Sequence, residues 1–505
     1  MSDADELEAA TASPRPARGG AALATLALVL TGVLQLVLLA VLARALTKAE
    51  LGAAQLLVLV STTISAVAPL GVPTALTVFL PRRPAAEARA LGWWGTVFLG
   101  LLALPWAGGL LLLASRLGGG DPALTYGFQL LALFTLADLP SQALPSYQLA
   151  LHRHASYFRT TLAFAVTRLL SIAIPAMLGA GLARIFELYT AIAVLRLAWC
   201  LVVFLWQEQG PLRGAGTSGG ELVRFGVPVS LSFMVNKLNV QVDKYLVRIV
   251  AGVGAFTVYN LGAVEIPLVA TLAYSATSAI VPQLSLAHHE GKREHFLELW
   301  HASAVKVGLI MMPAFWFFML FAEPAMRVLF TAGFVEAVIP FRVYLLLLPL
   351  RVCAYSGILR ALGESRPVVT SSVAALLLNA ALVVPLWHAL GIAGPAFAAV
   401  LSQVLAAAVL LRVIRARLEL RWWQTLPYPA LARSFAVAGL AALPASLALL
   451  LPSDPLQLVA GAFLLVTGYR VVGRLTGVVP AEDLRALRDL VALKGLKGPA
   501  TARKG

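Results

Sequence analysis

Long apolar stretches dominate the sequence and restrict the folds that the chain can adopt. Fourteen of them are about 20 residues long or longer, at about 20–43, 53–80, 90–114, 123–150, 160–179, 185–207, 222–250, 255–282, 301–322, 337–359, 367–388, 391–412, 430–451 and 456–476. A helix of about 20 residues, rising about 1.5 Å per residue, spans the roughly 30 Å hydrocarbon layer of a bilayer. Outer-membrane strands would instead give short alternating segments. The sequence therefore predicts an all-α polytopic membrane protein with about fourteen transmembrane helices.

The composition supports a membrane protein and argues against an enzyme. Only 12% of the residues are charged, whereas soluble domains average about 25%. Cys200 and Cys353 fall inside apolar stretches and predict neither a disulfide nor a metal site. His288, His289 and His295 lack the spacing of a zinc protease, so we interpret them as solvated loop residues. We find no phosphate-binding Gly loop with its Lys and no pairing of a nucleophile with a base, and we expect no cofactor, no metal and no catalysis.

The positive charges are distributed as in an inner-membrane protein. The net charge is +15, but it is spread over many loops rather than gathered into a nucleic-acid-binding patch, and we expect no nucleic-acid partner. With the N-terminus inside, the inner loops hold fifteen Lys or Arg residues and the outer loops at most seven. The positive-inside rule and the even helix count thus place both termini in the cytoplasm. The basic tail at the C-terminus agrees and can contact anionic headgroups.

A flexible segment divides the apolar stretches into two groups. Residues 209–220 read QGPLRGAGTSGG and resemble a linker between lobes. We therefore divide the chain into a cytoplasmic tail (1–18), an N-terminal lobe of six helices (19–208), the linker (209–220), a C-terminal lobe of six helices (221–420), two further helices (421–478), and a cytoplasmic amphipathic helix with a basic tail (479–505). The amphipathic pattern of residues 480–494 indicates a helix at the inner membrane surface.

The two lobes show signs of duplication. An offset of 207 residues places Arg153 on Arg360 and Arg159 on Arg366, each pair after the fourth helix of its lobe. The segment around Arg44 also parallels the segment around Arg248, because each Arg ends one helix shortly before a Gly opens the next. This pattern predicts two pseudo-symmetric six-helix lobes. Many transporters with such repeats alternate access to a site at the membrane midplane between the lobes.

A stripe of cations in the seventh stretch is the strongest candidate site. Lys237, Gln241, Lys244 and Arg248 follow one another at steps of four, three and four, which puts them on one helix face. Charge at membrane depth is costly and usually faces a wet cavity. We predict a central anion site at Lys237 and Lys244, with Arg248 and its counterpart Arg44 at the outer rim. Alternatively, Lys244 and Arg248 extend to the outer headgroups without a binding role.

Three carboxylates at apparent membrane depth are candidates for ion coupling. They are Asp138, Asp243 and Glu265, which could bind a coupling H⁺ or Na⁺; the membrane potential is the alternative driving force. Structural pairing is the competing explanation, for example between Arg168 or Arg196 and Asp138 or Glu187. The cations at this depth, Arg168, Arg196, Lys306, Arg342 and Arg351, either pair in this way or in part line the central cavity, where Arg favours phosphate.

The sequence resembles the polysaccharide or oligosaccharide flippases of the multidrug/oligosaccharidyl-lipid/polysaccharide (MOP) exporter superfamily, from about residue 20 to 478. The segments that carry the resemblance are LARALTKAELG with Arg44 and Gly52, PLGVPTAL, QVDKYLVRIVAGVGAFTVYNLGAV around Asp243, Gly254 and Tyr259, EPAMRVLFTAGF, LRALGESRP, and LLLNAALVVPLWHALGIAGPAFAAVLSQ with Asn379, Gly391 and Gly394. Arg44 and the stripe match positions where the family pattern places cations. Fourteen helices are more than the twelve usual in O-antigen flippases and are similar to the number in lipid II flippases.

The resemblance implies a flippase in the bacterial cytoplasmic membrane. Its substrate would be an oligosaccharide on undecaprenyl pyrophosphate, moved to the outer leaflet as the lobes rock around a cationic cavity. A lipid II flippase is the alternative, and a multidrug antiporter of the same superfamily fits less well because its cavity should be acidic. A membrane glycosyltransferase would need a large outer loop, which the chain lacks. The implied partners are membrane lipids and a polysaccharide polymerase or glycosyltransferases.

Overall fold

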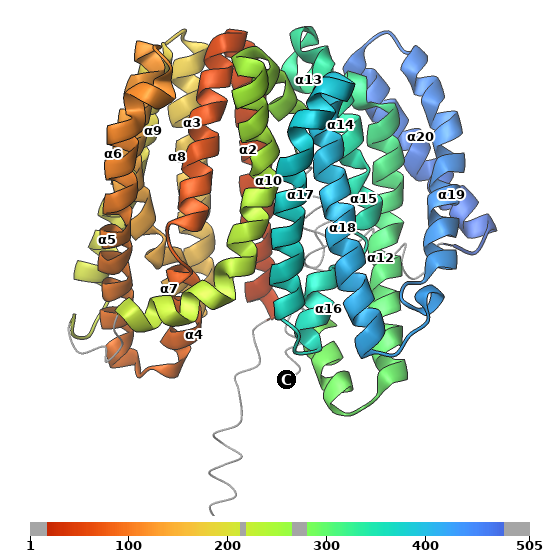
Figure 1. Cartoon of the computed structure of the whole chain (residues 1–505), viewed down its shortest axis with the longest axis horizontal. Coiled ribbons are helices and arrows are strands. Elements are labelled where there is room, and N and C mark those ends of the chain that lie inside the picture. Colours follow the sequence, from red (N-terminus) through yellow and green to blue (C-terminus); the bar gives the residue numbers. More distant parts are fainter. Residues whose placement is uncertain (1–17, 213–218, 265–279, 479–505) are drawn as a thin grey trace, which may run out of the picture.

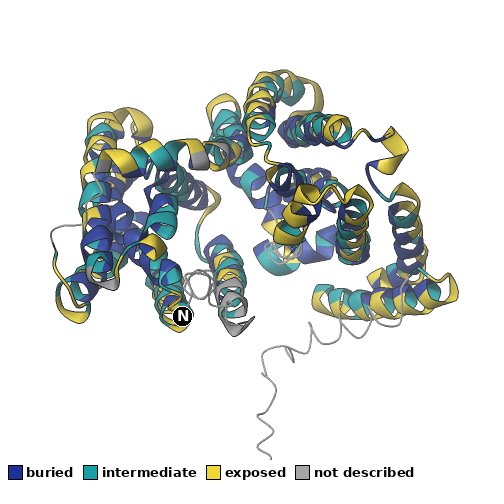
Figure 2. Cartoon of the chain, turned by 90° about the horizontal axis from the view of Figure 1, so that it is seen from below, coloured by how far each residue is buried: buried dark blue, intermediate teal, exposed yellow. Residues whose placement is uncertain are grey.

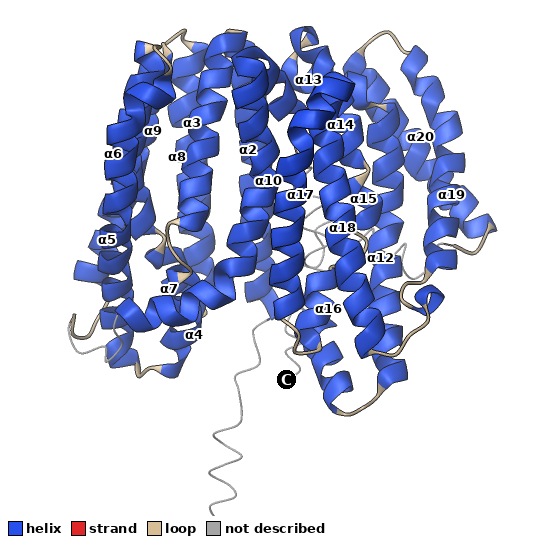
Figure 3. Ribbon diagram, viewed as in Figure 1, coloured by secondary structure: helices blue, strands red, loops and turns tan. Residues whose placement is uncertain are grey.

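The computed structural model describes residues 18–212, 219–264 and 280–478, and all regular structure in these ranges is helical (Figure 3). The α-helices of the first half include α2 (Arg18–Ala45), α3 (Lys48–Val67), α4 (Val72–Phe79), α5 (Ala85–Gly118), α6 (Pro122–Ser141), α7 (Ala143–Ala150), α8 (His154–Met177) and α9 (Leu182–Val202). Those of the second half are α10 (Gly219–Gly262), α12 (Arg293–Leu320), α13 (Ala322–Phe330), α14 (Val338–Leu345), α15 (Leu347–Leu350), α16 (Tyr355–Ala361), α17 (Arg366–Leu390), α18 (Gly394–Arg417), α19 (Tyr428–Ala445) and α20 (Asp454–Leu475). The prediction of an all-α membrane fold is confirmed.

The number of membrane spans differs from the prediction. Within the described ranges, twelve candidate spans are long and apolar enough to cross a bilayer. One of them, Arg366–Arg417, contains both α17 and α18, which the sequence counts as two stretches. Much of the predicted stretch 255–282 lies outside the described residues, as do the amphipathic helix at 480–494 and most of the linker. The count of fourteen is therefore not confirmed.

The helices form two groups on either side of the centre of the molecule (Figure 1). In the first group α5 packs on α6, α6 on α9, and α2 on α8. In the second group α17 packs on α18, α12 on α19, and α19 on α20. Helix α10 packs on α17 and also on α3 and α4, so it connects the two groups along its length.

Glycines with a positive φ angle break the helices at two places. The predicted stretch 53–80 breaks into α3 and α4 at Gly71, which has φ = 76°, a conformation that Gly adopts without strain. A second break lies at Gly252 (φ = 80°), which separates the long first part of α10 from Val253 onward. The end of the predicted seventh stretch at 250 agrees with this break.

The contact surface between α10 and helices α3 and α4 of the first group, here called the seam, is closely packed at both ends. At one end, a Cβ on Gly71 would lie 2.1 Å from the carbonyl oxygen of Gly226, so only glycine permits this approach. The Ser230 hydroxyl donates to the Thr74 hydroxyl one turn further on, at 3.2 Å. At the other end, the Thr257 hydroxyl donates to the carbonyl of Lys48 at 3.2 Å. The seam thus holds the two groups together through the depth of the bundle.

The surface around the bundle is apolar, as lipid contact requires. Seen from below, exposed residues follow the outer flanks of the helices and buried residues fill the interior (Figure 2). Among the exposed side chains are Leu112 (83%), Met177 (72%), Phe463 (69%) and Leu475 (82%). A soluble protein would seldom leave so many large apolar side chains in water.

Candidate functional site

The predicted stripe on α10 faces the first group of helices. The amide of Gln241 is buried against α3, where its Nε2 donates to the Thr62 hydroxyl at 3.2 Å and its Oε1 accepts from the Thr63 hydroxyl. Tyr245 shares this contact, because its hydroxyl lies 2.7 Å from that of Thr63. Gln241 therefore fixes the orientation of the stripe, and Lys237 and Lys244 lie half-buried on either side of it along the helix.

Asp243 lies away from the stripe, inside the second group of helices. Its side chain is fully buried and accepts hydrogen bonds at Oδ2 from the hydroxyls of Tyr259 and Tyr344. Its other oxygen, Oδ1, is buried and has no hydrogen-bond partner among the described residues. One turn earlier on the same helix, the Asn239 carbonyl accepts a hydrogen bond from the amide of Asn379 on α17, at 2.9 Å. The third predicted coupling residue, Glu265, lies outside the described residues.

The two cations predicted for the outer rim both lie where α2 and the first part of α10 end. Arg44 donates from Nη1 to the Leu329 carbonyl at 2.6 Å and from Nη2 to the Val328 carbonyl. These carbonyls belong to the last turn of α13, whose partial negative charge attracts a cation. Arg248 lines a pocket of about 390 Å³ together with Glu50 of α3. Arg44 thus lies at the contact between α2 and α13, whereas Arg248 lies at the contact between α10 and α3.

We predict that Arg44 holds the outer ends of α2 and α13 together. Replacing Arg44 with alanine removes its hydrogen bonds to the end of α13, so this end should separate more often from α2. The measurement is labelling of an introduced cysteine, Val328→Cys, with a membrane-impermeant maleimide; the native Cys200 and Cys353 are buried. We expect severalfold faster labelling.

The control is Arg327→Ala. Arg327 is on the same helix, but it pairs with Glu323 and lies 4.0 Å from Asp454 rather than contacting α2. Equal labelling rates of Val328→Cys in the Arg44→Ala and Arg327→Ala backgrounds would contradict the proposed role of Arg44.

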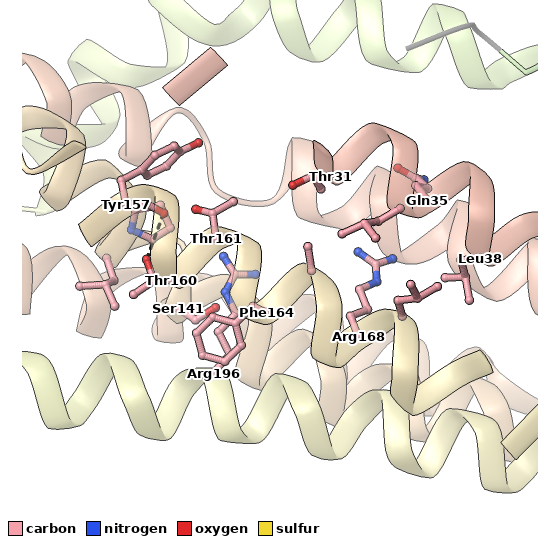
Figure 4. A pocket seen from close by; sticks show the side chains of 15 residues that line it. Thr31, Gln35, Leu38, Ser141, Tyr157, Thr160, Thr161, Phe164, Arg168 and Arg196 are labelled. Atoms are coloured by element: carbon pink, nitrogen blue, oxygen red, sulfur yellow. Dashed lines mark hydrogen bonds between the residues drawn. The ribbon is translucent and has the colours of Figure 1, made fainter. Parts of the chain in front are cut away.

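The first group encloses a cationic cavity that the stripe did not predict. One part of it, of about 270 Å³, lies between α2, α7, α8 and α9 and is lined by Arg168 and Arg196 together with Thr31 and Gln35 (Figure 4). A second part, of about 390 Å³, extends toward α3 and shares both arginines. Thr62, which receives the hydrogen bond from Gln241, lines this second part. The cavity therefore reaches the seam at the stripe.

The two arginines of this cavity differ in their partners. Arg196 donates to Oδ1 of Asp138 at 3.0 Å, and Oδ2 of the same carboxylate accepts from Ser65 at 2.8 Å and from Gln142 at 3.1 Å. This confirms the predicted pairing of Arg196 with Asp138. Arg168 stacks 5.0 Å from the ring centre of Tyr189, and its buried Nε has no hydrogen-bond partner among the described residues.

The second group encloses a larger cavity, of about 840 Å³. It lies between α10, α16, α17 and α18. Of these helices, α16 and the start of α17 lie at the end of the bundle where α2 begins (Figure 1). Three arginines line it, at positions 351, 360 and 366, and none of the residues that the structure places in its lining is Asp or Glu. Sequence reasoning used Arg360 and Arg366 only as markers of the repeat. The sequence could not show that the short loop between α16 and α17 lies beside α10 and α18, and this placement brings both arginines to the cavity.

The remaining predicted charges lie outside these cavities. Glu187 pairs with Arg184 at 2.8 Å, so it is not the partner of Arg168. In the histidine-rich loop, Lys292 lies 2.7 Å from Glu290 and holds the pKa of that carboxyl below its usual value. Within the ranges that the structure covers, no three His, Cys, Asp or Glu side chains gather as metal ligands.

Comparison with protein families identifies one that this chain matches. The family described as "polysaccharide biosynthesis protein" matches residues 41–339, more than half of the chain. No curated protein matches the sequence significantly.

Solved structures share the fold at low sequence identity. The lipid II flippase MurJ in an inward closed conformation has a TM-score of 0.69 and 13% identity, covering 89% of this chain and 98% of that one. An inward-facing MATE family multidrug resistance transporter of the MOP superfamily has a TM-score of 0.58 and 17% identity, covering 77% and 94%. A MOP transporter from Pyrococcus furiosus, with reverse polarity of its binding pocket, has a TM-score of 0.51 and 15% identity, covering 80% and 94%. The chain therefore belongs to the polysaccharide biosynthesis protein family, and it shares the fold of these solved transporters and flippases.

Proposed function

We propose that the protein translocates a lipid-linked oligosaccharide, carried on undecaprenyl pyrophosphate, across the bacterial cytoplasmic membrane by alternating access. The family match supports a substrate in polysaccharide synthesis. The fold supports a transporter whose two helix groups rock against each other. The proposed orientation has both termini in the cytoplasm, following the distribution of Lys and Arg.

The charge of the two cavities is the observation that carries this proposal. Arginine at positions 168 and 196 lines one cavity and arginine at 351, 360 and 366 lines the other. Among the described residues that line the cavity of the first group, Asp138 is the carboxylate, and Arg196 already neutralises it. The planar donor fork of arginine suits phosphate oxygens, and charges at membrane depth usually pair with each other or face a water-filled cavity on a substrate pathway. An anionic headgroup therefore fits better than a cationic drug.

Two alternatives remain distinct from this proposal. A lipid II flippase would use the same anionic diphosphate, and the fold similarity to MurJ favours it. A multidrug antiporter is favoured by the fold similarity to MATE transporters, but the arginine-rich cavities oppose binding of cations.

The driving force and the partners are part of the proposal. A coupling H⁺ or Na⁺ would be best accommodated at Asp243, since Oδ1 of its buried carboxylate has no partner in the described part of the chain. Asp138 is less suitable because Arg196 already occupies it. The membrane potential alone is the alternative, because an anionic headgroup moving outward is driven by an inside-negative potential. A polysaccharide polymerase or glycosyltransferases would supply and consume the substrate.

The test is transport by the purified protein in proteoliposomes. We expect it to expose a fluorescent undecaprenyl pyrophosphate-linked oligosaccharide to a membrane-impermeant quencher faster than empty vesicles do. Lipid II and a cationic dye are the other substrates. Faster transport of lipid II would favour the first alternative. Transport of the dye without transport of either glycolipid would reject a flippase.

A further inference from the structure

The cavity of the second helix group has the features of a binding site for a diphosphate group. Its volume of about 840 Å³ lies within the usual range of ligand pockets, roughly 300–1,000 Å³. It is about three times the volume of the part of the first cavity drawn in Figure 4, about 270 Å³. A diphosphate with one or more attached sugars would fit into a space of this size.

Arg360 and Arg366 have no carboxylate beside them among the described residues that line this cavity. The guanidinium carbon of Arg360 lies 5.9 Å from the ring centre of Phe233, a cation–π contact that does not neutralise its charge. The carboxylate nearest in sequence, Glu364, pairs instead with Arg417. Arg366 is exposed at the first position of α17. Two cations thus lie at the mouth of the cavity, and Arg351 lies in its lining.

Neutral donors supplement the arginines. Hydroxyls of Tyr355, Ser356 and Ser365 and the amides of Asn236 and Gln403 line the same space. Ser365 is the N-cap residue of α17, but its side chain makes no capping hydrogen bond. The positive end of the 25-residue helix α17 therefore adds to the field of the arginines at the mouth. Planar guanidinium groups with several hydroxyls are the donors that a diphosphate requires.

The cavity lies before the stripe along α10. It contacts α10 at Phe233 and Asn236, and Phe233 lies one turn before Lys237 on the same helix face. The stripe faces α3, as the contacts of Gln241 establish. Of the helices that line the cavity, α16 and the start of α17 lie at the end of the bundle where α2 begins, which the basic loops predict to be cytoplasmic.

We propose that this cavity is a loading site, which binds the diphosphate of an isoprenoid-linked substrate on the cytoplasmic side before the substrate reaches the stripe. The identity of the isoprenoid and the direction of transport in this inference rest on the proposed function. The binding of a diphosphate by this cavity does not depend on the proposed function.

The test measures binding of inorganic diphosphate and of farnesyl diphosphate to the purified full-length protein by calorimetry in detergent. The variant Arg360→Gln/Arg366→Gln should weaken binding of both ligands at least tenfold. The control Arg421→Gln should leave binding unchanged, because Arg421 stacks on Trp423 at 5.4 Å in a similar way but lies outside the cavity. Phosphatidylglycerol in mixed micelles should not compete.

A second pair of variants guards against misfolding. Ser365→Asp introduces a negative charge at the mouth while providing a good N-cap, so α17 should remain stable. It should weaken diphosphate binding, whereas Ser365→Asn, a neutral residue of similar size and capping ability, should not. Equal binding by the wild type, Ser365→Asp and the arginine variant would overturn the loading site. So would displacement of the diphosphate by phosphatidylglycerol, which would identify a site for membrane lipid.

The transport assay separates this inference from the proposed function. If the wild type transports the glycolipid and the arginine variant transports it equally well at low substrate concentration, the loading site is rejected and the flippase stands. If the wild type does not transport it but the variants still lose diphosphate binding, the anion site stands and the flippase is rejected.

Discussion

Replacing Lys237 and Lys244 together with alanine is expected to abolish glycan export while leaving the amount of protein in the membrane unchanged. The two lysines flank Gln241, which the hydrogen bonds to Thr62 and Thr63 fix against α3. They therefore lie on the face of α10 that meets the other helix group, where an alternating-access mechanism places the substrate. Without them, the anionic headgroup loses its attraction to the centre of the pathway.

The expected loss is one of function rather than of folding. A lysine at the centre of a membrane helix costs about 2.5–3.5 kcal/mol on insertion, so its removal should not impair insertion. Export is measured as surface polysaccharide in a strain that lacks its own flippase, and membrane abundance by immunoblot.

Two controls make the lysine result specific. Lys237→Arg/Lys244→Arg keeps both charges and should retain export. Arg116→Ala removes an exposed cation in the last turn of α5 that lines none of the cavities described above, and it should have no effect. Normal export from the double alanine variant would reject the central anion site and leave the two arginine-lined cavities as the candidates.

The helices of this protein were predictable because lipid exposure leaves a strong sequence signal. A stretch such as 367–388 must be apolar over its whole length to cross a bilayer, and α17 indeed covers Arg366–Leu390. The break at Gly71 was not predicted. It depends on the close approach of Gly226, which lies 155 residues further along the chain.

The candidate site was predictable only in part. The spacing of the stripe predicted a helix, which α10 provides, but it could not predict which helix Gln241 contacts. The pairing of Arg196 with Asp138 followed from the cost of isolated charge in a membrane. The carbonyl partners of Arg44 could not be predicted, because main-chain acceptors on α13 have no signature in residue type. The arginine-lined cavity of the second group needed the folded positions of α16, α17 and α18.

Breaking the Arg196–Asp138 pair from either side should give the largest loss of stability. Asp138→Ala leaves the guanidinium without its carboxylate, and Arg196→Gln leaves the carboxylate with only Ser65 and Gln142. Removing one partner of a buried pair costs about 3–5 kcal/mol. We expect the lower end of this range because the side chain of Arg196 is 29% exposed. The measurement is unfolding of the purified protein in detergent.

The neutral double variant Asp138→Asn/Arg196→Gln distinguishes a structural pair from a coupling site. It retains hydrogen-bonding groups without buried charge, so it should recover most of the lost stability, and if the pair is structural it should transport at a rate near that of the wild type. The exposed pair Arg184–Glu187 on the same helix is the matched control, since its disruption should cost less than about 1 kcal/mol. A stable double variant that had lost its dependence on pH or Na⁺ would instead assign the coupling ion to Asp138. Coupling would then be located in the first helix group rather than at Asp243, and substrate binding at Arg168 would lie directly beside it.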